Sequence, residues 1–204
     1  MLRALLIGNG EKISDLKKWA AQADFVLAAD GGVDNALAQG VTPDLVIGDL
    51  DSASQTARRK LPADKFLLID NQNNTDLEKA LTYLQKKNFK SCTLVGFLGG
   101  RWDFSLGNLL TLTRFARKME ITIIGQNWQG FLITRPRRFE TAPGKRVSLI
   151  PLKTCQGVGL QGLKFPLKNA RLSVGTTRSL SNQTTGKFFR VSLQSGILFV
   201  YVEN

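Results

Sequence analysis

The sequence predicts a two-part α/β protein, in which an N-terminal domain with a parallel sheet precedes a C-terminal antiparallel β-sandwich. In residues 1–126, short apolar runs alternate with helix-like stretches, and this alternation is typical of parallel strands joined by crossover helices. From Phe131 onward, short segments of alternating polarity are separated by Gly, Pro and Asn turns. With 204 residues the chain has room for two small domains. We therefore expect an α/β domain over 1–126 and a β-sandwich over 127–204.

The expected strands of the first part are nearly continuous in apolar residues, as strands covered on both faces require. They span residues 2–7, 25–29, 45–47, 66–69, 93–97 and 121–124. Apolar residues at helical spacing predict helices between them. These helices span residues 14–21, 33–38, 75–87 and 105–118. Thr75 is a good N-cap for the third helix, and Glu78 stands where a capping box needs it.

The second part carries the alternating polarity of antiparallel strands. The expected strands span residues 147–150, 170–174, 189–193 and 196–202. Turn residues separate them, as short hairpins and meanders require. The pattern changes near 126–135, where we place the domain boundary.

The absence of histidine excludes several mechanisms at once. Ser-His-Asp and Cys-His triads and histidine-ligated zinc all need an imidazole. Cys92 and Cys155 stand singly in apolar surroundings, so neither a zinc site nor a disulfide framework is predicted, and both are expected to be buried free thiols. Carboxylates must therefore carry any acid, base or metal chemistry.

The net charge of +12 is concentrated in the second part, because Glu140 and Glu203 are the only acidic residues after residue 126. The basic residues are scattered among apolar ones, apart from Arg135, Arg137 and Arg138, so the chain lacks an arginine-rich arm. We do not expect a nucleic-acid partner, since a basic surface equally attracts nucleotide anions.

The first apolar run ends at Gly8-Asn9-Gly10, too soon for a signal peptide or a membrane span. We therefore expect a cytoplasmic protein with no membrane partner. The same Gly-Asn-Gly turn resembles the start of a dinucleotide-binding loop, but Ile13 stands where its third glycine belongs. A tight strand-to-helix turn explains it equally well.

Several aspartates follow predicted strands or begin predicted helices. They are Asp30 before Gly31-Gly32, Asp49 and Asp51 in the turn Gly48–Ser52, Asp76, and Asp103. The loops at the carboxyl edge of an open α/β sheet converge, and ligands bind there. Gathered carboxylates repel one another, and a hard cation such as Mg²⁺ offsets this cost while it bridges phosphate oxygens.

Simpler interpretations exist for some of these residues. Asp30 and Asp76 can merely start turns or helices, where aspartate is common. The paired carboxylates of Asp49 and Asp51 are harder to explain in that way. In Gly99–Asp103, glycines would let a phosphate approach the backbone while Arg101 holds its oxygens, or Arg101 and Asp103 simply form an ion pair.

Taken together, these motifs resemble the thiamin pyrophosphokinase family. The resemblance rests on a series of ordered motifs that spans nearly the whole chain. They are 29–32, 43–52, 75–76 and 100–103 in the first part, and 162–167 with 176–182 in the second. It implies an enzyme that transfers a pyrophosphate group from ATP to the hydroxyl of thiamin, giving thiamin diphosphate and AMP, with Mg²⁺ as cofactor. It also implies a homodimer with active sites at the subunit interface.

The resemblance also implies roles for individual residues. Asp49, Asp51 and Asp76 fall at metal positions, and catalysis is assigned to Asp51, Asp76 and Arg101. The nucleotide side comprises Asp30, Gly31, Gly32, Thr75, Arg101 and Asp103. Thiamin is expected at Gln72, Ser179, Ser181 and Asn182.

Two departures limit these implied roles. Asn73 stands where many family members have a further aspartate, so a weaker metal site or another choice of divalent ion is expected. Phe104 follows Asp103 where histidine or glutamine is usual. Phe165 is a candidate for contact with the thiamin rings, although a place in the core explains it as well.

Two alternative functions stay open at this point. A related diphosphokinase acting on another hydroxymethyl or hydroxyethyl heterocycle would keep the metal acids and change the pocket. A non-catalytic thiamin-binding or nucleic-acid-binding protein would need neither ATP nor magnesium.

Overall fold

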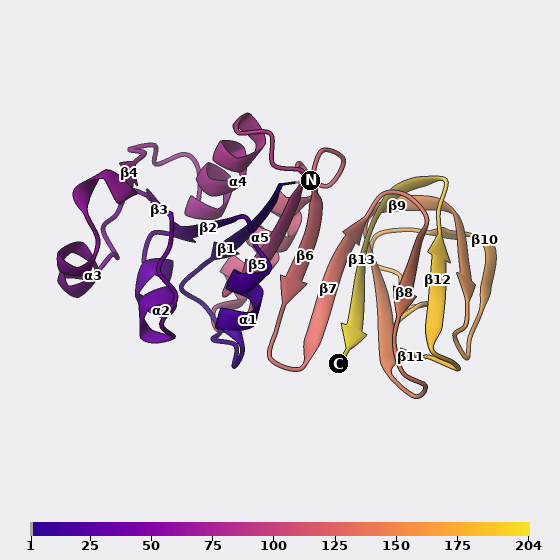
Figure 1. The fold of residues 1–204 in the computed structure, drawn as a ribbon. Coiled ribbons are helices and arrows are strands. Elements are labelled where there is room, and N and C mark those ends of the chain that lie inside the picture. The colour runs from indigo at the N-terminus through magenta and orange to yellow at the C-terminus, as the bar shows by residue number, and fades with distance from the viewer. Residues whose placement is uncertain (1) are drawn as a thin grey trace. The chain divides into compact units, whose positions relative to one another are not determined.

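A computed structural model of the protein describes residues 2–204. The chain divides into two compact units, residues 1–126 and 127–204. The first unit alternates strands with helices, and the second consists of strands (Figure 1). The predicted fold class, an α/β unit followed by an antiparallel β-sandwich, is therefore confirmed.

The first unit contains a parallel sheet with the strand order β4-β3-β2-β1-β5-β6. Its strands are β1 (Arg3–Ile7), β2 (Phe25–Ala29), β3 (Leu45–Gly48), β4 (Phe66–Leu68), β5 (Ser91–Val95) and β6 (Glu120–Ile124). The chain runs outward from β1 to β4 and then returns to β5 on the other side of β1. In such a sheet the direction of winding changes beside the first strand, and loops at that carboxyl edge leave a crevice for ligands.

Five α-helices and one 3₁₀ helix connect these strands among the described residues. They are α1 (Leu16–Ala21), α2 (Gly32–Ala38), α3 (Gln55–Lys60), η1 (Ala63–Lys65), α4 (Asp76–Lys86) and α5 (Trp102–Leu112). Thr75 caps α4 as predicted, because its side chain accepts a hydrogen bond from the Glu78 N–H. The Glu78 carboxylate accepts from Arg114 at 2.6 Å instead of completing a capping box. The helix α5 begins three residues before Ser105, and it ends at Leu112 rather than Lys118.

The sequence pattern does not predict α3. Among its six residues only Ala57 is buried, so the helix has no apolar stripe to reveal it. Ser54 starts the helix by accepting a hydrogen bond from the Ala57 N–H. Ala57 packs with Val46, Leu50 and Ala53 beneath the loop that follows β3.

The second unit is built around the long strand β9 (Arg146–Gln161). Its first half pairs with β11 (Asn182–Gln183) and β13 (Ser195–Glu203), and its second half pairs with β10 (Leu167–Leu172) and β12 (Phe188–Ser192). The strand β7 (Trp128–Ile133) pairs with β13, and β8 (Arg137–Glu140) pairs with β12. One core between the sheet faces includes Phe139, Leu149 and Phe189.

The strand β9 buries alternate residues, but its inward face changes in the middle. Val147 and Leu149 are buried, as are Cys155 and then Val158, three positions later. Gly157 lies between the last two with a φ of +65°, and the pairing with β10 shifts register there. An extra residue in a bulge moves the side-chain alternation to the other face, which lets one strand serve both sheets.

The sequence pattern also does not predict β7, β8 and β11. The strand β7 includes Gly130, and the Phe199 ring occupies the space where a Cβ at Gly130 would lie. The strand β8 buries only Phe139 of its four residues. Cys92 and Cys155 are buried free thiols, as predicted. Among the described residues, no helix is both long enough and apolar enough to cross a membrane.

Candidate active site

The acidic turn after β3 is held in a strained backbone conformation. Gly48 has a φ of +152°, and a Cβ there would lie 2.9 Å from Oδ1 of Asp76 and 3.1 Å from Cβ of Asp30. Leu50 has a φ of +64°, and its buried side chain anchors the turn to the core. The Leu50 carbonyl accepts a hydrogen bond from Arg58 of α3. The turn is therefore fixed by packing below it and by α3 beside it.

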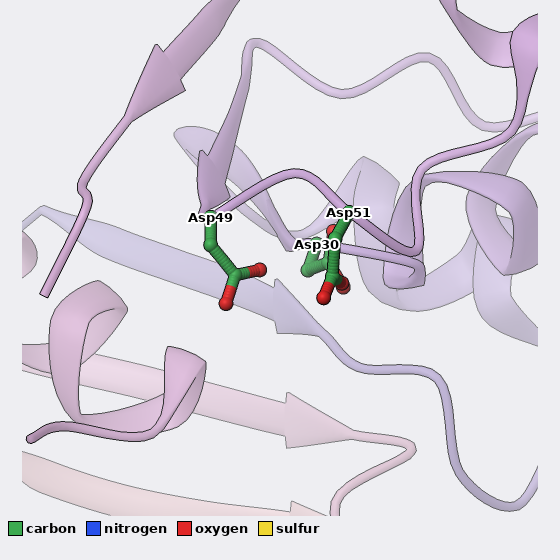
Figure 2. A group of neighbouring side chains, drawn as sticks. All are labelled: Asp30, Asp49 and Asp51. Carbon is green, nitrogen blue, oxygen red and sulfur yellow. The ribbon is translucent and has the colours of Figure 1, made fainter. Parts of the chain in front are cut away.

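Three carboxylates come together at this turn. Asp30, Asp49 and Asp51 each offer an oxygen within 4.8 Å of the others, and Figure 2 shows their side chains converging from adjacent loop segments. Asp30 is buried, Asp49 is partly buried and Asp51 is exposed. We call these three residues the carboxylate triad.

The carboxylate triad meets the requirements of a divalent-cation site. Oδ1 of Asp49 is buried and has no hydrogen-bond partner within the described part of the chain. A buried acceptor without a partner is costly, and a hard cation with oxygen ligands would satisfy it. The residues present therefore fit a Mg²⁺-type ion.

Asp30 is placed by the end of β2 and the start of α2. Its backbone has a φ of +43°, and its carboxylate accepts from the Ser52 N–H at 3.2 Å. The next two residues, Gly31 and Gly32, are buried, and a Cβ at Gly32 would lie 2.1 Å from the Ile7 carbonyl oxygen. The contact gives Gly32 a packing role next to β1, whereas a Cβ at Gly31 would meet the side chains of Asn9 and Ser52.

Asp76, predicted as a metal ligand, lies outside the carboxylate triad and pairs with Lys79. The Lys79 ammonium donates to Oδ1 of Asp76 at 3.0 Å and lies 3.8 Å from Oδ2 of Asp49. Burial raises the pKa of the Asp76 carboxyl; Lys79 lowers this pKa, and the charges of Asp49 and Asp30 raise it. Asp76 therefore shares its electrostatic environment with the triad.

The N-cap and first turn of α5 form the ion pair that the simpler interpretation predicts. Arg101 binds the Asp103 carboxylate with two hydrogen bonds, of 3.1 Å and 2.5 Å, and both residues are exposed. This pair holds the pKa of Asp103 below its usual value. The Arg101 guanidinium also lies over the Phe104 ring, 4.5 Å from its centroid. Arg101 is thus a positioned, solvent-accessible cation.

Gln72 and Asn73 lie in the exposed segment before α4. The Asn73 N–H donates to the side chain of Asn71, and Asn73 is not part of the carboxylate triad. The triad therefore assembles without an acid at position 73.

In the second unit, the predicted thiamin residues are largely occupied with backbone contacts. The buried Ser179 hydroxyl donates to the Leu149 carbonyl at 2.9 Å. The buried Asn182 amide donates to the Phe165 carbonyl at 2.7 Å and accepts from the Phe165 N–H at 3.0 Å. Ser181 is exposed with a φ of +54°, and its N–H donates to Ser148.

Phe165 is not a core residue, because 62% of it is exposed. The alternative that places Phe165 in the core is therefore wrong. The two hydrogen bonds with Asn182 fix the backbone of Phe165, while its ring is exposed and the Lys164 ammonium lies 5.7 Å from the ring centroid. Asn182 thus presents an aromatic ring on the surface of the second unit.

The sequence pattern does not predict two contacts near the site. One joins Lys79 to Asp76 and Asp49, and the other joins Asp34 to Ser54. The Asp34 carboxylate accepts from the Ser54 N–H at 3.0 Å and from its hydroxyl at 2.5 Å, which ties α2 to the start of α3. The spacing of Asp76 and Lys79 is a weak signal, since residues three apart on a helix can pair. Nothing in the local sequence indicates that Lys79 is buried.

Known proteins resemble the chain along nearly its whole length. Residues 16–124 match the family model "Thiamin pyrophosphokinase, catalytic domain", and residues 133–198 match "Thiamin pyrophosphokinase, vitamin B1 binding domain". Thiamine pyrophosphokinase of Bacillus subtilis is 28% identical, over 96% of this chain and 95% of the relative.

Solved structures are similar as well. The crystal structure of thiamine pyrophosphokinase from Bacillus subtilis has a TM-score of 0.87 at 25% identity, covering 98% of this chain and 99% of that one. The thiamin pyrophosphokinase from Candida albicans has a TM-score of 0.88 at 17% identity, covering 100% and 89%. The second likeness bears on the fold alone.

Proposed function

Because the chain belongs to the thiamin pyrophosphokinase family, a family of diphosphotransferases, we propose that its carboxylate triad is the metal-dependent centre for pyrophosphate transfer from ATP to thiamin. The observation that carries this proposal is the unpartnered, buried Oδ1 of Asp49 beside Asp30 and Asp51. The carboxylate triad lies at the carboxyl edge of a parallel sheet, where such folds bind ligands.

In the proposed reaction the hydroxyl oxygen of thiamin attacks the β-phosphorus of ATP. A new bond forms between this oxygen and the β-phosphorus, the bond from the β-phosphorus to the oxygen of the α-phosphate breaks, and AMP leaves. The proton of the hydroxyl passes to a carboxylate or to water. Catalysis of this kind depends mainly on positioning and on electrostatic stabilisation.

Asp49 and Asp51 would hold the divalent ion, and Asp30 completes the same group of carboxylates. When bound, Mg²⁺ would supply charge neutralisation on the phosphate oxygens. The resemblance assigns Asp76 to the metal, and its pairing with Lys79 supports a place beside the ligands. Asp51 is exposed, so its carboxylate can also reach and orient the substrate hydroxyl.

The remaining predicted residues are assigned to the two substrates. We assign Arg101, already held by Asp103, to the phosphates, because a guanidinium can bind two oxygens of one phosphate. Gly31, Gly32 and Thr75 would shape the nucleotide side through their backbone. For thiamin, the exposed residues are better suited to direct contact than the buried ones. These exposed residues are Gln72, Ser181 and Phe165.

Ser179 and Asn182 are better suited to positioning, because their polar groups already hydrogen-bond to backbone. The Phe165 ring, which Asn182 holds in place, offers a flat surface to a cationic heterocycle, and cation–aromatic contact is attractive. This contact would offset the repulsion between the cation and the basic second unit.

We further propose a cytoplasmic homodimer whose active sites lie between subunits. The helix α5 exposes four large apolar side chains, and exposed apolar surface of this kind often marks an interaction site. They are Trp102, Phe104, Leu106 and Leu110. The two buried free thiols suit a reducing compartment. Sedimentation equilibrium of the purified chain tests the dimer, and a monomer at micromolar concentration would contradict it.

The decisive experiment measures AMP release from ATP with and without thiamin, in the presence of Mg²⁺ and again with excess chelator. We expect AMP and thiamin diphosphate to form in equal amounts, and only when thiamin and Mg²⁺ are both present. AMP formation without thiamin would contradict the proposed substrate. Full activity in chelator would contradict the metal site.

A further inference from the structure

Lys79 of α4 is a buried cation without a role in the reaction described above. Its side chain is only 3% exposed, and lysine is rarely buried to this extent unless it is paired. Its ammonium contacts Oδ1 of Asp76 at 3.0 Å and lies 3.8 Å from Oδ2 of Asp49. Lys79 therefore links the start of α4 to the acidic turn after β3.

The carboxylates around Lys79 repel one another. Asp30, Asp49 and Asp51 lie within reach of a single ion. The negative charges of Asp49 and Asp30 also act on the nearby Asp76 carboxyl, whose pKa they raise. Like charges a few ångströms apart in a partly buried site disfavour the folded arrangement. In the absence of a metal, the Lys79 ammonium compensates part of this negative charge, because it lies 3.0 Å from Asp76 and 3.8 Å from Asp49.

The same ammonium competes with an incoming metal ion. A divalent ion bound at the triad would lie near Asp49, and therefore near the positive charge of Lys79. The repulsion between the two cations lowers the affinity of the site for a free ion. A polyphosphate that arrives with the ion contributes negative charge and reduces this repulsion.

We propose that Lys79 is a positioning residue that serves as the built-in counter-cation of the acidic site. It keeps Asp76 and Asp49 in place while the site is empty, and it weakens binding of a free divalent ion, so that the ion is retained mainly together with the nucleotide. This inference rests on the proposed metal site at Asp49 and Asp51.

The test compares the purified full chain with its Lys79→Gln variant, because glutamine can still donate to Asp76 but carries no charge. Lys86→Gln is the matched control, since it removes an exposed charge from the same helix. Binding of Mn²⁺ is measured without nucleotide, by the electron paramagnetic resonance signal of the free ion. We expect the Kd of Lys79→Gln to fall by about tenfold or more, because a unit charge so close to the ion costs at least this much at intermediate dielectric.

The control should keep the wild-type Kd within about twofold, since an exposed charge far from the ion is screened. Equal Mn²⁺ affinity in wild type and Lys79→Gln, or weaker affinity in the variant, would overturn the role of Lys79 and leave the proposed function standing. If neither protein binds Mn²⁺, the proposed metal site is itself wrong and this inference falls with it.

Thermal unfolding keeps the inference testable if the variant is poorly folded. In chelator, Lys79→Gln should melt below wild type, and saturating Mn²⁺ should raise its Tm by more than it raises that of wild type. The reason is that the ion replaces the missing charge. A variant that stays unfolded in saturating Mn²⁺, or that gains no more than wild type, would contradict the inference.

Discussion

Among residues 2–204, Asp49 is the residue whose environment most clearly requires a ligand. Its Oδ1 is buried without a hydrogen-bond partner, while its Oδ2 faces Lys79. Asp51, two residues later, is exposed, and its Oδ1 accepts a local hydrogen bond from the Ser52 hydroxyl. The two carboxylates of one turn therefore differ in burial, and this difference suits one for holding an ion and the other for meeting the substrate.

Replacing Asp51 with asparagine should separate catalysis from stability. Because the Asp51 side chain is exposed, the free energy of unfolding should change by about 0.5 kcal/mol or less. Turnover should fall by about 100-fold or more, as it does when one stabilising group of an active site is lost. AMP release measures turnover, and Asp64→Asn, an exposed acid in η1, should leave it unchanged. Normal turnover in Asp51→Asn would contradict the proposed site.

Gly48 tests whether the turn tolerates a side chain. Alanine at this position would place its Cβ against Asp76 and Asp30 and would strain a backbone with a φ of +152°. We expect a loss of about 1–3 kcal/mol in the free energy of unfolding, measured by urea denaturation.

Gly107 provides the matched control, because it lies within α5 with open space around its Cβ position. Gly107→Ala should stabilise the chain by about 0.5–1 kcal/mol through helix propensity. If the two substitutions changed stability in the same direction, the close approach at Gly48 would not be the cause.

At the scale of elements, β12 shows how alternation divides the second unit into core and surface. Phe188 and Phe189 are neighbours in this strand, yet Phe188 is 48% exposed and Phe189 is fully buried. The Phe189 ring stacks on Phe139 with centroids 4.7 Å apart, whereas the Phe188 ring lies beneath the Arg138 guanidinium. One strand therefore joins the hydrophobic core to the basic surface.

Substituting the two phenylalanines separately should give very different results. Phe189→Ala should cost about 3–5 kcal/mol, because it removes a large ring from a packed core. Phe188→Ala should cost only about 0.5–1 kcal/mol, the value of an exposed cation–aromatic contact. Urea denaturation followed by circular dichroism measures both. A larger loss for Phe188→Ala than for Phe189→Ala would mean that the strand has another register, and equal losses would contradict this division into core and surface.

At the scale of the whole molecule, the net charge of +12 acts on the two substrates in opposite ways. ATP is an anion and should be attracted from a distance, whereas thiamin is a cation and must be attracted locally by carboxylates and rings. Salt screens the long-range part of this field.

Raising NaCl from about 50 mM to about 500 mM should lower kcat/KM for ATP severalfold, because the Debye length falls well below the size of the protein. The value for thiamin should change less. Sucrose at matched osmolality controls for effects other than charge. An equal fall for both substrates would argue against steering by the net charge.

Much of the molecule follows from local sequence. Every strand that is expected in the first part is present, because a doubly covered strand needs a continuous apolar run and such runs are easy to recognise. Thr75 caps α4 because the cap is encoded within one turn. Because the chain lacks histidine, carboxylates are the candidate catalytic and metal-binding groups. The paired aspartates after β3 are therefore recognisable as a candidate site. The polar helix α3 and the short strand β11 escape such reasoning, because they have no apolar period.

The sequence by itself determined the fold class, the acidic turn and the resemblance to a family, since each depends on residues close together in the chain or on motifs in order. Only the tertiary structure decided that Asp30 joins Asp49 and Asp51, that Phe165 is exposed, and that Lys79 is buried between Asp76 and Asp49. Helical periodicity places Lys79 away from the apolar stripe of α4 that contains Leu77 and Leu81. Lys79 is buried because the acidic turn, from a distant part of the chain, packs beside it. A local sequence pattern cannot predict such a long-range contact.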